Sequence, residues 1–289
     1  MDVDPPSYRR RSPAQGRRLL TAPIARRPIR RVEDGGVYQA PRRRRSPWPF
    51  ALFGIFGVVV LLSVGVSLTV PQEPRIAVPD GVPPARGTEV PPIDFAGPGR
   101  TAGLLREWAQ PQADALDIPV VALEAYGHAA AVLAATRPEC GLAWTTLAGI
   151  GSVESRHGRH GGATLAPDGT ATPEIRGVPL DGSPGLAEIR DTDGGRLDGD
   201  SLLDRAMGPM QFIPETWERW GVDANGDGVA DPDNIDDAAL SAGRYLCERG
   251  GDLDSAEGWT RALMAYNLSG EYMTLVRDRA AAYGVGVRP

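Results

Sequence analysis

The sequence predicts a mainly α-helical exported domain that one transmembrane helix tethers to a membrane. Residues 50–70 form a stretch of 21 residues without a charge, which as a helix would span roughly 30 Å, the hydrocarbon thickness of a bilayer. Over residues 101–109 and 119–137, leucine, valine and alanine recur at the three-to-four spacing of amphipathic helices. An apolar fraction of 42% over 289 residues excludes wholesale disorder.

The charge distribution predicts the topology. Residues 1–45 contain thirteen arginines against four acids, a net charge of +9, whereas the rest of the chain carries −15. Arginine before an apolar stretch keeps the N-terminus in the cytoplasm, so everything after residue 70 is expected outside. We therefore interpret residues 46–70 as a signal anchor rather than a buried core helix or a cleaved signal peptide. The acidic folded part argues against nucleic-acid binding.

Two low-complexity segments flank this anchor. Residues 1–45, rich in proline and arginine, predict a disordered cytoplasmic tail that is attracted to anionic lipid; a cytoplasmic partner stays open. Residues 71–100 contain eight prolines and predict a semi-rigid spacer, which as polyproline II would reach on the order of 90 Å. The exported domain is then residues 101–289. It contains Cys140 and Cys247, which an oxidising exterior would allow to pair, the alternative being two buried thiols.

A single acid interrupts the next apolar stretch. Residues 140–158 predict a helix that ends near Gly158, and Glu154 shares its apolar face with Leu147 and Ile150. A carboxylate there is costly unless it is paired or protonated. Glu154 therefore either forms a salt bridge with an arginine, or has a pKa raised by desolvation that lets it act as an acid near neutral pH.

Further along the chain, uncharged polar residues lie inside apolar stretches. Gln211 lies in one, and Tyr266 and Asn267 interrupt an expected helix over residues 262–272. Buried polar groups need partners, which could be sugar hydroxyls, an acetamide or the backbone. Between these stretches and Glu154, residues 161–200 contain nine glycines and no aromatic residue, a composition typical of a functional or disordered loop.

An aspartate-rich segment predicts a calcium loop. Asp223, Asn225 and Asp227 would supply oxygen ligands at loop positions one, three and five, and Val229 a backbone carbonyl at position seven. Position twelve is Asn234 rather than the usual bidentate glutamate. The alternative is a turn rich in Asp and Asn that binds no ion.

Three groups of residues carry a family resemblance. They are Glu154 and Ser155 with Gly158 and Arg159; residues 208–214 with Thr216 and Trp217; and residues 265–267 with Tyr272. In this order and spacing they resemble the catalytic domain of lytic murein transglycosylases, most closely the membrane-bound lytic murein transglycosylase B type. The resemblance covers roughly residues 101–289 and implies a lysozyme-like fold in a bacterial cell-membrane protein whose catalytic domain is extracellular or periplasmic.

The resemblance also implies an activity. The family cleaves the β-1,4 bond between N-acetylmuramic acid and N-acetylglucosamine in peptidoglycan and leaves 1,6-anhydromuramyl ends. Glu154 would be the single general acid and base. The residues expected around the sugar are Ser155, Gln211, Tyr266 and Asn267. The family's calcium loop closes on a later carboxylate, which corresponds to Asp237 and competes here with Asp231, Asp233 and Asp236. A structural Ca²⁺ and no organic cofactor are therefore expected.

Three alternative functions share parts of this interpretation. A muramidase on the same fold would admit water and hydrolyse the same bond. A non-catalytic scaffold would bind the cell wall through a degenerate site. A zinc peptidase would use His157 and His160, but the chain has no H-E-x-x-H motif.

Overall fold

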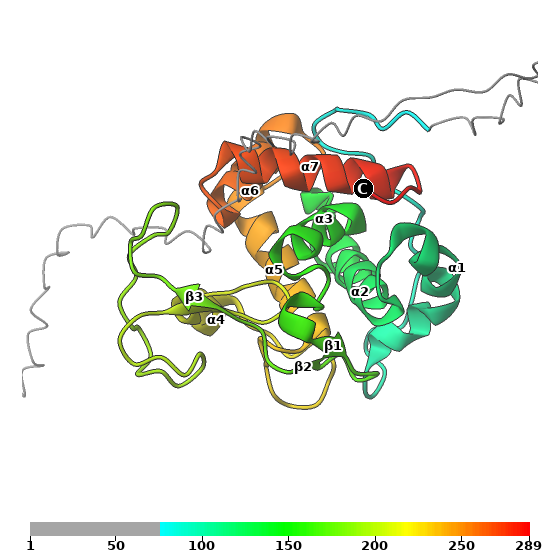
Figure 1. The fold of residues 1–289 in the computed structure, drawn as a ribbon. Coiled ribbons are helices and arrows are strands. Elements are labelled where there is room, and N and C mark those ends of the chain that lie inside the picture. Colours follow the sequence, from blue (N-terminus) through cyan, green and yellow to red (C-terminus); the bar gives the residue numbers. More distant parts are fainter. Residues whose placement is uncertain (1–75) are drawn as a thin grey trace, which may run out of the picture. The chain divides into compact units, whose positions relative to one another are not determined.

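The computed structural model describes residues 76–289 (Figure 1). The predicted cytoplasmic tail, the transmembrane segment and the first residues of the linker lie outside this part. Within residues 76–289, no helix combines the length and the hydropathy needed to cross a membrane. The described chain is mainly helical, as the sequence predicts.

Helices account for most of the regular secondary structure of the described chain (Figure 1). The 3₁₀ segments are η1 (Thr101–Leu105), η2 (Pro138–Cys140) and η3 (His160–Gly162). The α-helices are α1 (Arg106–Leu116), α2 (Val120–Thr136), α3 (Trp144–Ser155), α4 (Pro214–Trp220), α5 (Ile235–Gly250), α6 (Ala256–Tyr266) and α7 (Gly270–Gly284). The strands form two antiparallel pairs, β1 (Thr164–Leu165) with β2 (Ala171–Thr172) and β3 (Arg176–Pro179) with β4 (Arg205–Met207).

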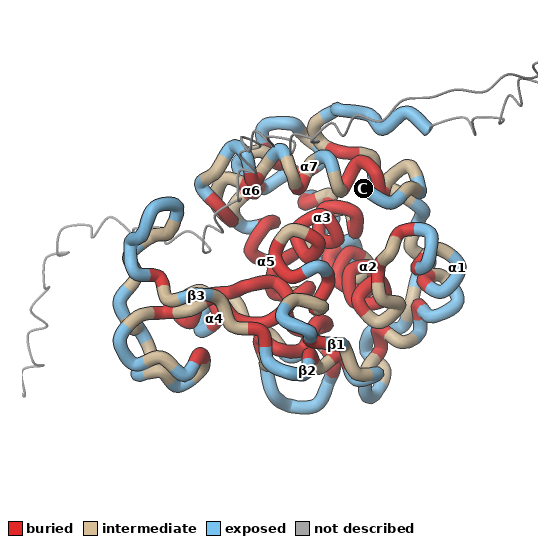
Figure 2. The backbone as a smooth tube through the Cα atoms, in the orientation of Figure 1, coloured by how far each residue is buried: buried red, intermediate tan, exposed pale blue. Residues whose placement is uncertain are grey.

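The core lies where α2, α3 and α5 meet the other helices (Figure 2). α3 packs against α7, and α2 packs against α5. Small residues of α3 make these contacts close: a Cβ at Gly149 would lie 2.7 Å from the Val276 carbonyl oxygen, and one at Gly151 would meet the Tyr126 hydroxyl. The apolar face of α3 is therefore enclosed on two sides, which fixes the helix that carries Glu154.

The predicted disulfide is confirmed. Cys140 in η2 is bonded to Cys247 in α5, and 107 positions separate them in the sequence. The bond ties the segment just before α3 to the long helix α5. A cross-link between residues so far apart removes much of the freedom of the unfolded chain.

The last part of the expected spacer packs onto the domain. The Ala85 carbonyl accepts a hydrogen bond from Thr145 Oγ1, and the Thr88 carbonyl accepts one from the Trp144 indole N–H, each at 2.9 Å. Arg86 forms an ion pair with Asp254. A buried indole N–H needs an acceptor, and the strap formed by residues 85–88 supplies one. The folded unit therefore begins before residue 101.

The glycine-rich stretch is ordered by its aspartates. We call residues 176–207 the aspartate arm. Asp191 Oδ1 accepts hydrogen bonds from the backbone N–H groups of Asp193, Gly194 and Gly195, at 2.9–3.1 Å. Buried Asp204 accepts from the backbone N–H and the hydroxyl of Thr192. Side-chain bonds to the backbone hold the middle of this segment, while Leu180 and Met207 near its ends are buried in the core.

Candidate active site

Glu154 lies in the last turn of α3 and is buried, with 4% of its surface exposed. The helix ends at Ser155, because Arg156 takes the left-handed conformation (φ 55°). The N–H of Arg156 bonds to the Ser152 carbonyl, and that of His157 to the Gly151 carbonyl. The helix was expected to end near Gly158, so it stops three residues earlier and at an arginine. The acid is nevertheless sheltered at a helix end, where the sequence places it.

Two tyrosines stand beside this carboxyl. The Tyr272 hydroxyl donates a hydrogen bond to Glu154 Oε1 at 2.6 Å, and the Tyr266 ring stacks on Tyr272 with centroids 6.5 Å apart. Burial raises the pKa of both phenols well above the usual value, and the charge of Glu154 raises it further. Tyr272 therefore stays a proton donor toward Glu154. The sequence motif includes Tyr272, but sequence reasoning did not place it in the site.

The turn at residues 208–212 is clamped between helices. Ser155 Oγ donates to the Pro209 carbonyl at 2.6 Å, and it accepts from the Gly158 N–H at 2.7 Å. On the other side, the Tyr266 hydroxyl donates to the Met210 carbonyl at 2.9 Å. Two of the predicted site residues thus hold this turn beside Glu154, one from α3 and one from α6.

The other two predicted sugar contacts lie nearby in the fold. Gln211 belongs to the same turn, has a left-handed backbone (φ 54°), and donates its side-chain N–H to the Gly208 carbonyl at 3.0 Å. Asn267 is buried at the C-cap of α6, at the start of the turn that leads to α7 and Tyr272. That Ser155, Gln211, Tyr266 and Asn267 contact a sugar stays a prediction.

His157 joins the end of α3 to two other helices. Its Nδ1 lies 3.2 Å from the Tyr126 hydroxyl of α2, and its Nε2 lies 2.9 Å from the Tyr283 hydroxyl of α7. Burial lowers the pKa of His157 to about 3, so the imidazole is neutral. Both ring nitrogens are thus engaged with tyrosine hydroxyls, which locks the residues that follow Glu154.

The backbone of the predicted calcium loop donates hydrogen bonds to Asp237. This buried carboxylate accepts hydrogen bonds from the N–H groups of Ala224 (2.7 Å), Asn225 (3.2 Å) and Asp231 (2.9 Å), and burial raises its pKa to about 6. Asp223 and Asp227 likewise accept from N–H groups of the loop. Across residues 76–289 no group of three or more Asp, Glu, His or Cys is arranged to hold a metal.

The donor chemistry of the loop nevertheless suits calcium. Asp223, Asn225, Asp227, Asp237 and the Val229 carbonyl offer oxygen only, the ligand type that Ca²⁺ takes. Two of the competing carboxylates are otherwise occupied. Asp233 pairs with Arg176 at 2.7 Å, and Asp236 pairs with Arg100 at 2.6 Å. Asp231 and Asp237 are not in ion pairs among the described residues and accept backbone N–H groups instead.

Fold and site together are consistent with a lysozyme-like class of enzyme, in which a helical domain shelters one carboxyl at a helix end. The family model described as "Transglycosylase SLT domain" matches residues 203–268. The match includes the clamped turn, the predicted calcium loop, Tyr266 and Asn267, and it supports peptidoglycan as the substrate in general terms. The match supports a lytic transglycosylase-type domain in this chain and does not specify the subfamily. The comparisons with curated proteins and with solved structures return no match.

Proposed function

We propose that this protein is a peptidoglycan lytic transglycosylase with Glu154 as its single general acid and base. It cleaves the β-1,4 bond between N-acetylmuramic acid and N-acetylglucosamine and leaves 1,6-anhydromuramyl ends. One observation carries the proposal: Glu154 is buried at the end of α3 with the Tyr272 hydroxyl 2.6 Å from its Oε1. The family match at residues 203–268 supports the same class of reaction.

The hydrogen bond from Tyr272 determines which oxygen of the Glu154 carboxyl carries the proton. Because Oε1 accepts from Tyr272, the acidic proton of Glu154 is carried by Oε2. That proton passes to the glycosidic oxygen as the bond to C1 breaks, and the electron pair stays with that oxygen. The carboxylate then takes the proton of the C6 hydroxyl while O6 bonds to C1. Glu154 ends protonated again and no water is consumed.

The tyrosine hydroxyl favours the charged intermediate state. A hydrogen bond to a carboxylate is stronger than one to a neutral carboxylic acid, so Tyr272 stabilises Glu154 after it has given up its proton. Most glycosidases pair two carboxylates, whereas α3 carries Glu154 as its one acid. The acetamide of the substrate would then stabilise the positive charge at C1.

Product analysis tests this proposal against its rivals. Purified peptidoglycan is digested with the full-length chain, and the released fragments are measured by mass spectrometry. A transglycosylase leaves anhydro ends, which are one water lighter than the reducing ends that a hydrolytic muramidase leaves. Reducing ends alone would make the protein a muramidase, and the absence of any fragments would favour a wall-binding scaffold.

We further propose that residues 50–70 anchor the protein in the bacterial membrane with its N-terminus in the cytoplasm. The disulfide between Cys140 and Cys247 supports an oxidising compartment for the folded part. Protease added to cells whose outer layers are permeable should digest the domain and leave the N-terminal tail intact. A domain that becomes accessible only after the membrane is lysed would contradict this topology.

We also propose a structural Ca²⁺ in the loop formed by residues 223–237. Asp223, Asn225, Asp227, Val229 and Asp237 would hold it, and the ion would take over oxygens that now accept the loop's own N–H groups. The ion would stabilise the segment between α4 and α5, next to the clamped turn.

A further inference from the structure

The residue that ends α3 departs from a local rule of helix structure. A helix that stops in the left-handed conformation usually does so at glycine, because a side chain is strained there. Here the position holds Arg156, with φ 55° and an exposed side chain. Its guanidinium forms no hydrogen bond or ion pair with any residue in the described part of the chain. A simple helix stop does not need this side chain, and its exposed guanidinium is available to a ligand outside the protein.

Three further arginines surround the same end of α3. Arg159 Nε donates to the Arg156 carbonyl at 3.0 Å, and Arg279 Nη1 donates to Ser152 Oγ, one turn before Arg156, at 2.9 Å. Arg159 and Arg288 share the carboxylate of Asp117, at 3.0 and 2.7 Å.

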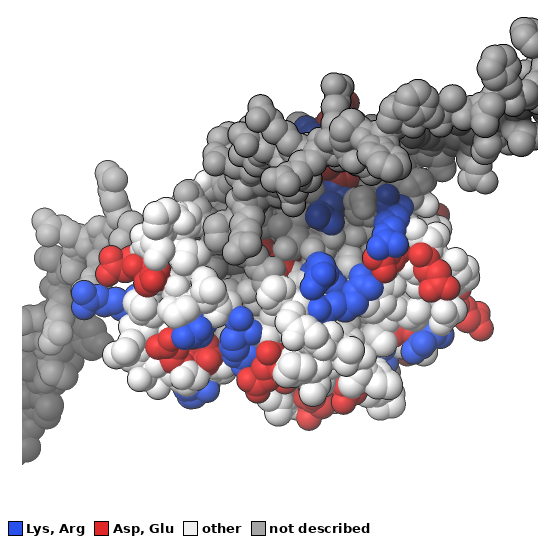
Figure 3. All heavy atoms as spheres, in the orientation of Figure 1, with Lys and Arg blue, Asp and Glu red and all other residues white. Residues whose placement is uncertain are grey.

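Two of these four guanidinium groups, those of Arg159 and Arg288, are paired with Asp117. Figure 3 shows several basic side chains close together on the face of the molecule that it draws. Because the chain beyond residue 45 carries a net charge of −15, this arginine cluster reverses the sign of its surroundings. A local positive potential of this kind attracts anions to the end of α3.

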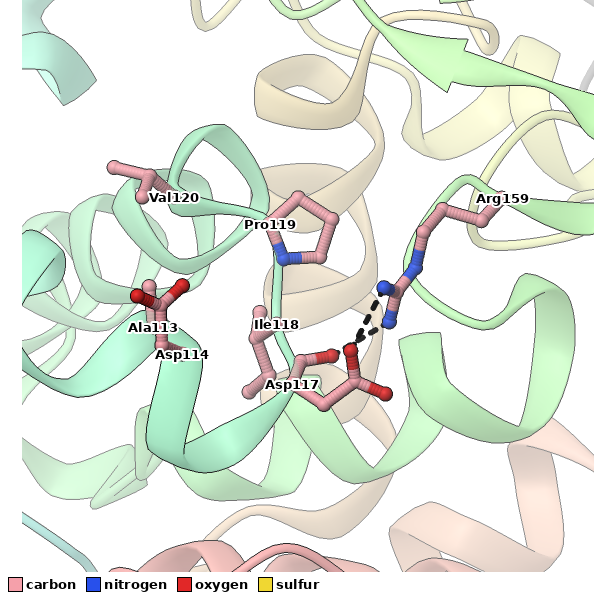
Figure 4. Close-up of a pocket in the computed structure, with 7 residues that line it drawn as sticks. All are labelled: Ala113, Asp114, Asp117, Ile118, Pro119, Val120 and Arg159. Atoms are coloured by element: carbon pink, nitrogen blue, oxygen red, sulfur yellow. Dashed lines mark hydrogen bonds and ion pairs between the residues drawn. The ribbon is translucent and has the colours of Figure 1, made fainter.

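A cavity of about 240 Å³ opens beside the arginine cluster (Figure 4). Ile118, Pro119 and the ion-paired side chains of Arg159 and Asp117 line it, and most of its lining surface is polar. Arg159 follows the catalytic helix directly, because its N–H donates to the Ser155 carbonyl at 3.0 Å. One side chain of the cavity lining, that of Arg159, thus lies on the segment that follows Glu154.

The distance between the arginine cluster and the Glu154 carboxyl is about the length of a short peptide. On α7, Tyr272 touches Glu154 and Arg279 touches Ser152, and these seven residues rise roughly 10 Å. An extended chain of three residues covers the same span. A peptide attached to a sugar that lies at Glu154 can thus reach the arginine cluster.

We propose that Arg156, aided by Arg159 and Arg279, binds a carboxylate of the short acidic peptides that peptidoglycan strands carry. The guanidinium fork matches a carboxylate in two parallel hydrogen bonds. The hydrogen bonds of His157 to Tyr126 and Tyr283 fix the backbone next to Arg156, from which the guanidinium extends. This inference rests on the proposed function, and it makes peptide-bearing strands the preferred substrate over bare glycan.

The test compares two substrates on the full-length chain. Peptide-bearing strands and strands stripped of peptides by an amidase are cleaved by the wild type, Arg156→Gly, Arg156→Lys and the control Arg137→Gln. Glycine suits φ 55°, so Arg156→Gly should melt no earlier than the wild type. We expect the ratio of kcat/KM on peptide-bearing to stripped strands to fall about tenfold in Arg156→Gly, the loss of one charged hydrogen bond. Arg156→Lys should recover part of it, and Arg137→Gln should keep the wild-type ratio.

An unchanged ratio in Arg156→Gly, or an equal fall in the control, would overturn the proposal. Binding separates this failure from failure of the proposed function. If the wild type cleaves neither substrate, the proposed function is wrong. The binding of Glu154→Gln and of the double variant Glu154→Gln, Arg156→Gly to both kinds of strand is then measured by sedimentation. If the double variant binds less only to peptide-bearing strands, the subsite is supported. Equal binding by the two variants refutes it.

Discussion

Two regions of the folded unit are held together in different ways. In the helical half, formed by α1–α3 and α5–α7, much of the backbone is buried (Figure 2), and its apolar side chains form one core that extends to Phe212 and Trp217. In the loop half, residues 160–234, aspartate side chains accept backbone N–H groups, as Asp191 and Asp204 do in the aspartate arm. The candidate site lies where the halves meet, because Ser155 and Tyr266 of the helical half clamp the turn at residues 208–212. Glu154 thus belongs to the helical half, and residues of both halves surround it.

Among the substitutions that leave Glu154 in place, Tyr272→Phe is expected to have the largest effect on kcat. The variant removes one hydroxyl from Glu154 and leaves the ring in place. A hydrogen bond to a charged group contributes about 1.5–3 kcal/mol, so kcat should fall about 10- to 100-fold with little change in KM. Steady-state kinetics on purified peptidoglycan measure both.

Tyr283→Phe is the matched control, because its hydroxyl bonds to His157 rather than to Glu154. It should cost stability but keep most of kcat. Equal losses of kcat in the two variants would mean that Tyr272 acts through packing and not through the carboxyl.

His157→Asn tests how the stability of the helical half depends on pH. In the folded state the pKa of His157 is about 3, against about 6.5 in the unfolded chain. Below pH 6.5 the unfolded state binds a proton that the folded state does not, so stability falls as the pH falls. Between pH 7.5 and 5.0 the wild type should lose about 2 kcal/mol through this residue.

Asparagine tolerates the left-handed backbone at this position and does not titrate. In urea unfolding, the difference in stability between wild type and His157→Asn should therefore narrow by about 2 kcal/mol from pH 7.5 to 5.0. A constant difference would show that His157 is protonated or solvated in the folded protein.

Chelation of calcium addresses the loop half and should give the smallest effect. At calcium tenfold above its dissociation constant, binding adds about 1.4 kcal/mol, and a domain of this size would then melt about 3–6 °C lower in chelator. Hydrogen exchange should rise at residues 223–237 and stay unchanged in α3 and α7. Asp223→Asn should lose the response to calcium, and a wild-type melting curve that ignores the chelator would exclude a structural ion.

The helical half could be predicted from the sequence because its signals are local. The apolar patterns predicted helices where α2 and α3 lie, and Glu154 was the one acid in the apolar stretch that forms α3. Tyr272 was not placed in the site from its own environment, because it lies 118 positions from Glu154 and only the packing of α7 on α3 brings them together.

The loop half was harder to predict for a related reason. Its glycines and aspartates indicate turns, but which N–H each carboxylate accepts depends on the folded path of the chain. The proline-rich segment before residue 101 was expected to be a spacer, yet Ala85 and Thr88 supply acceptors that buried Thr145 and Trp144 require. Proline content predicts an extended backbone and does not reveal what that backbone covers.

The most direct test of the central claim is turnover by Glu154→Gln. Glutamine keeps the shape of the side chain and an acceptor for the Tyr272 hydroxyl, but it carries no acidic proton. The account predicts that this variant folds, melts near the wild type, sediments with peptidoglycan and releases no anhydromuramyl fragments. Turnover like that of the wild type would contradict it, because the proton would then have to come from another group.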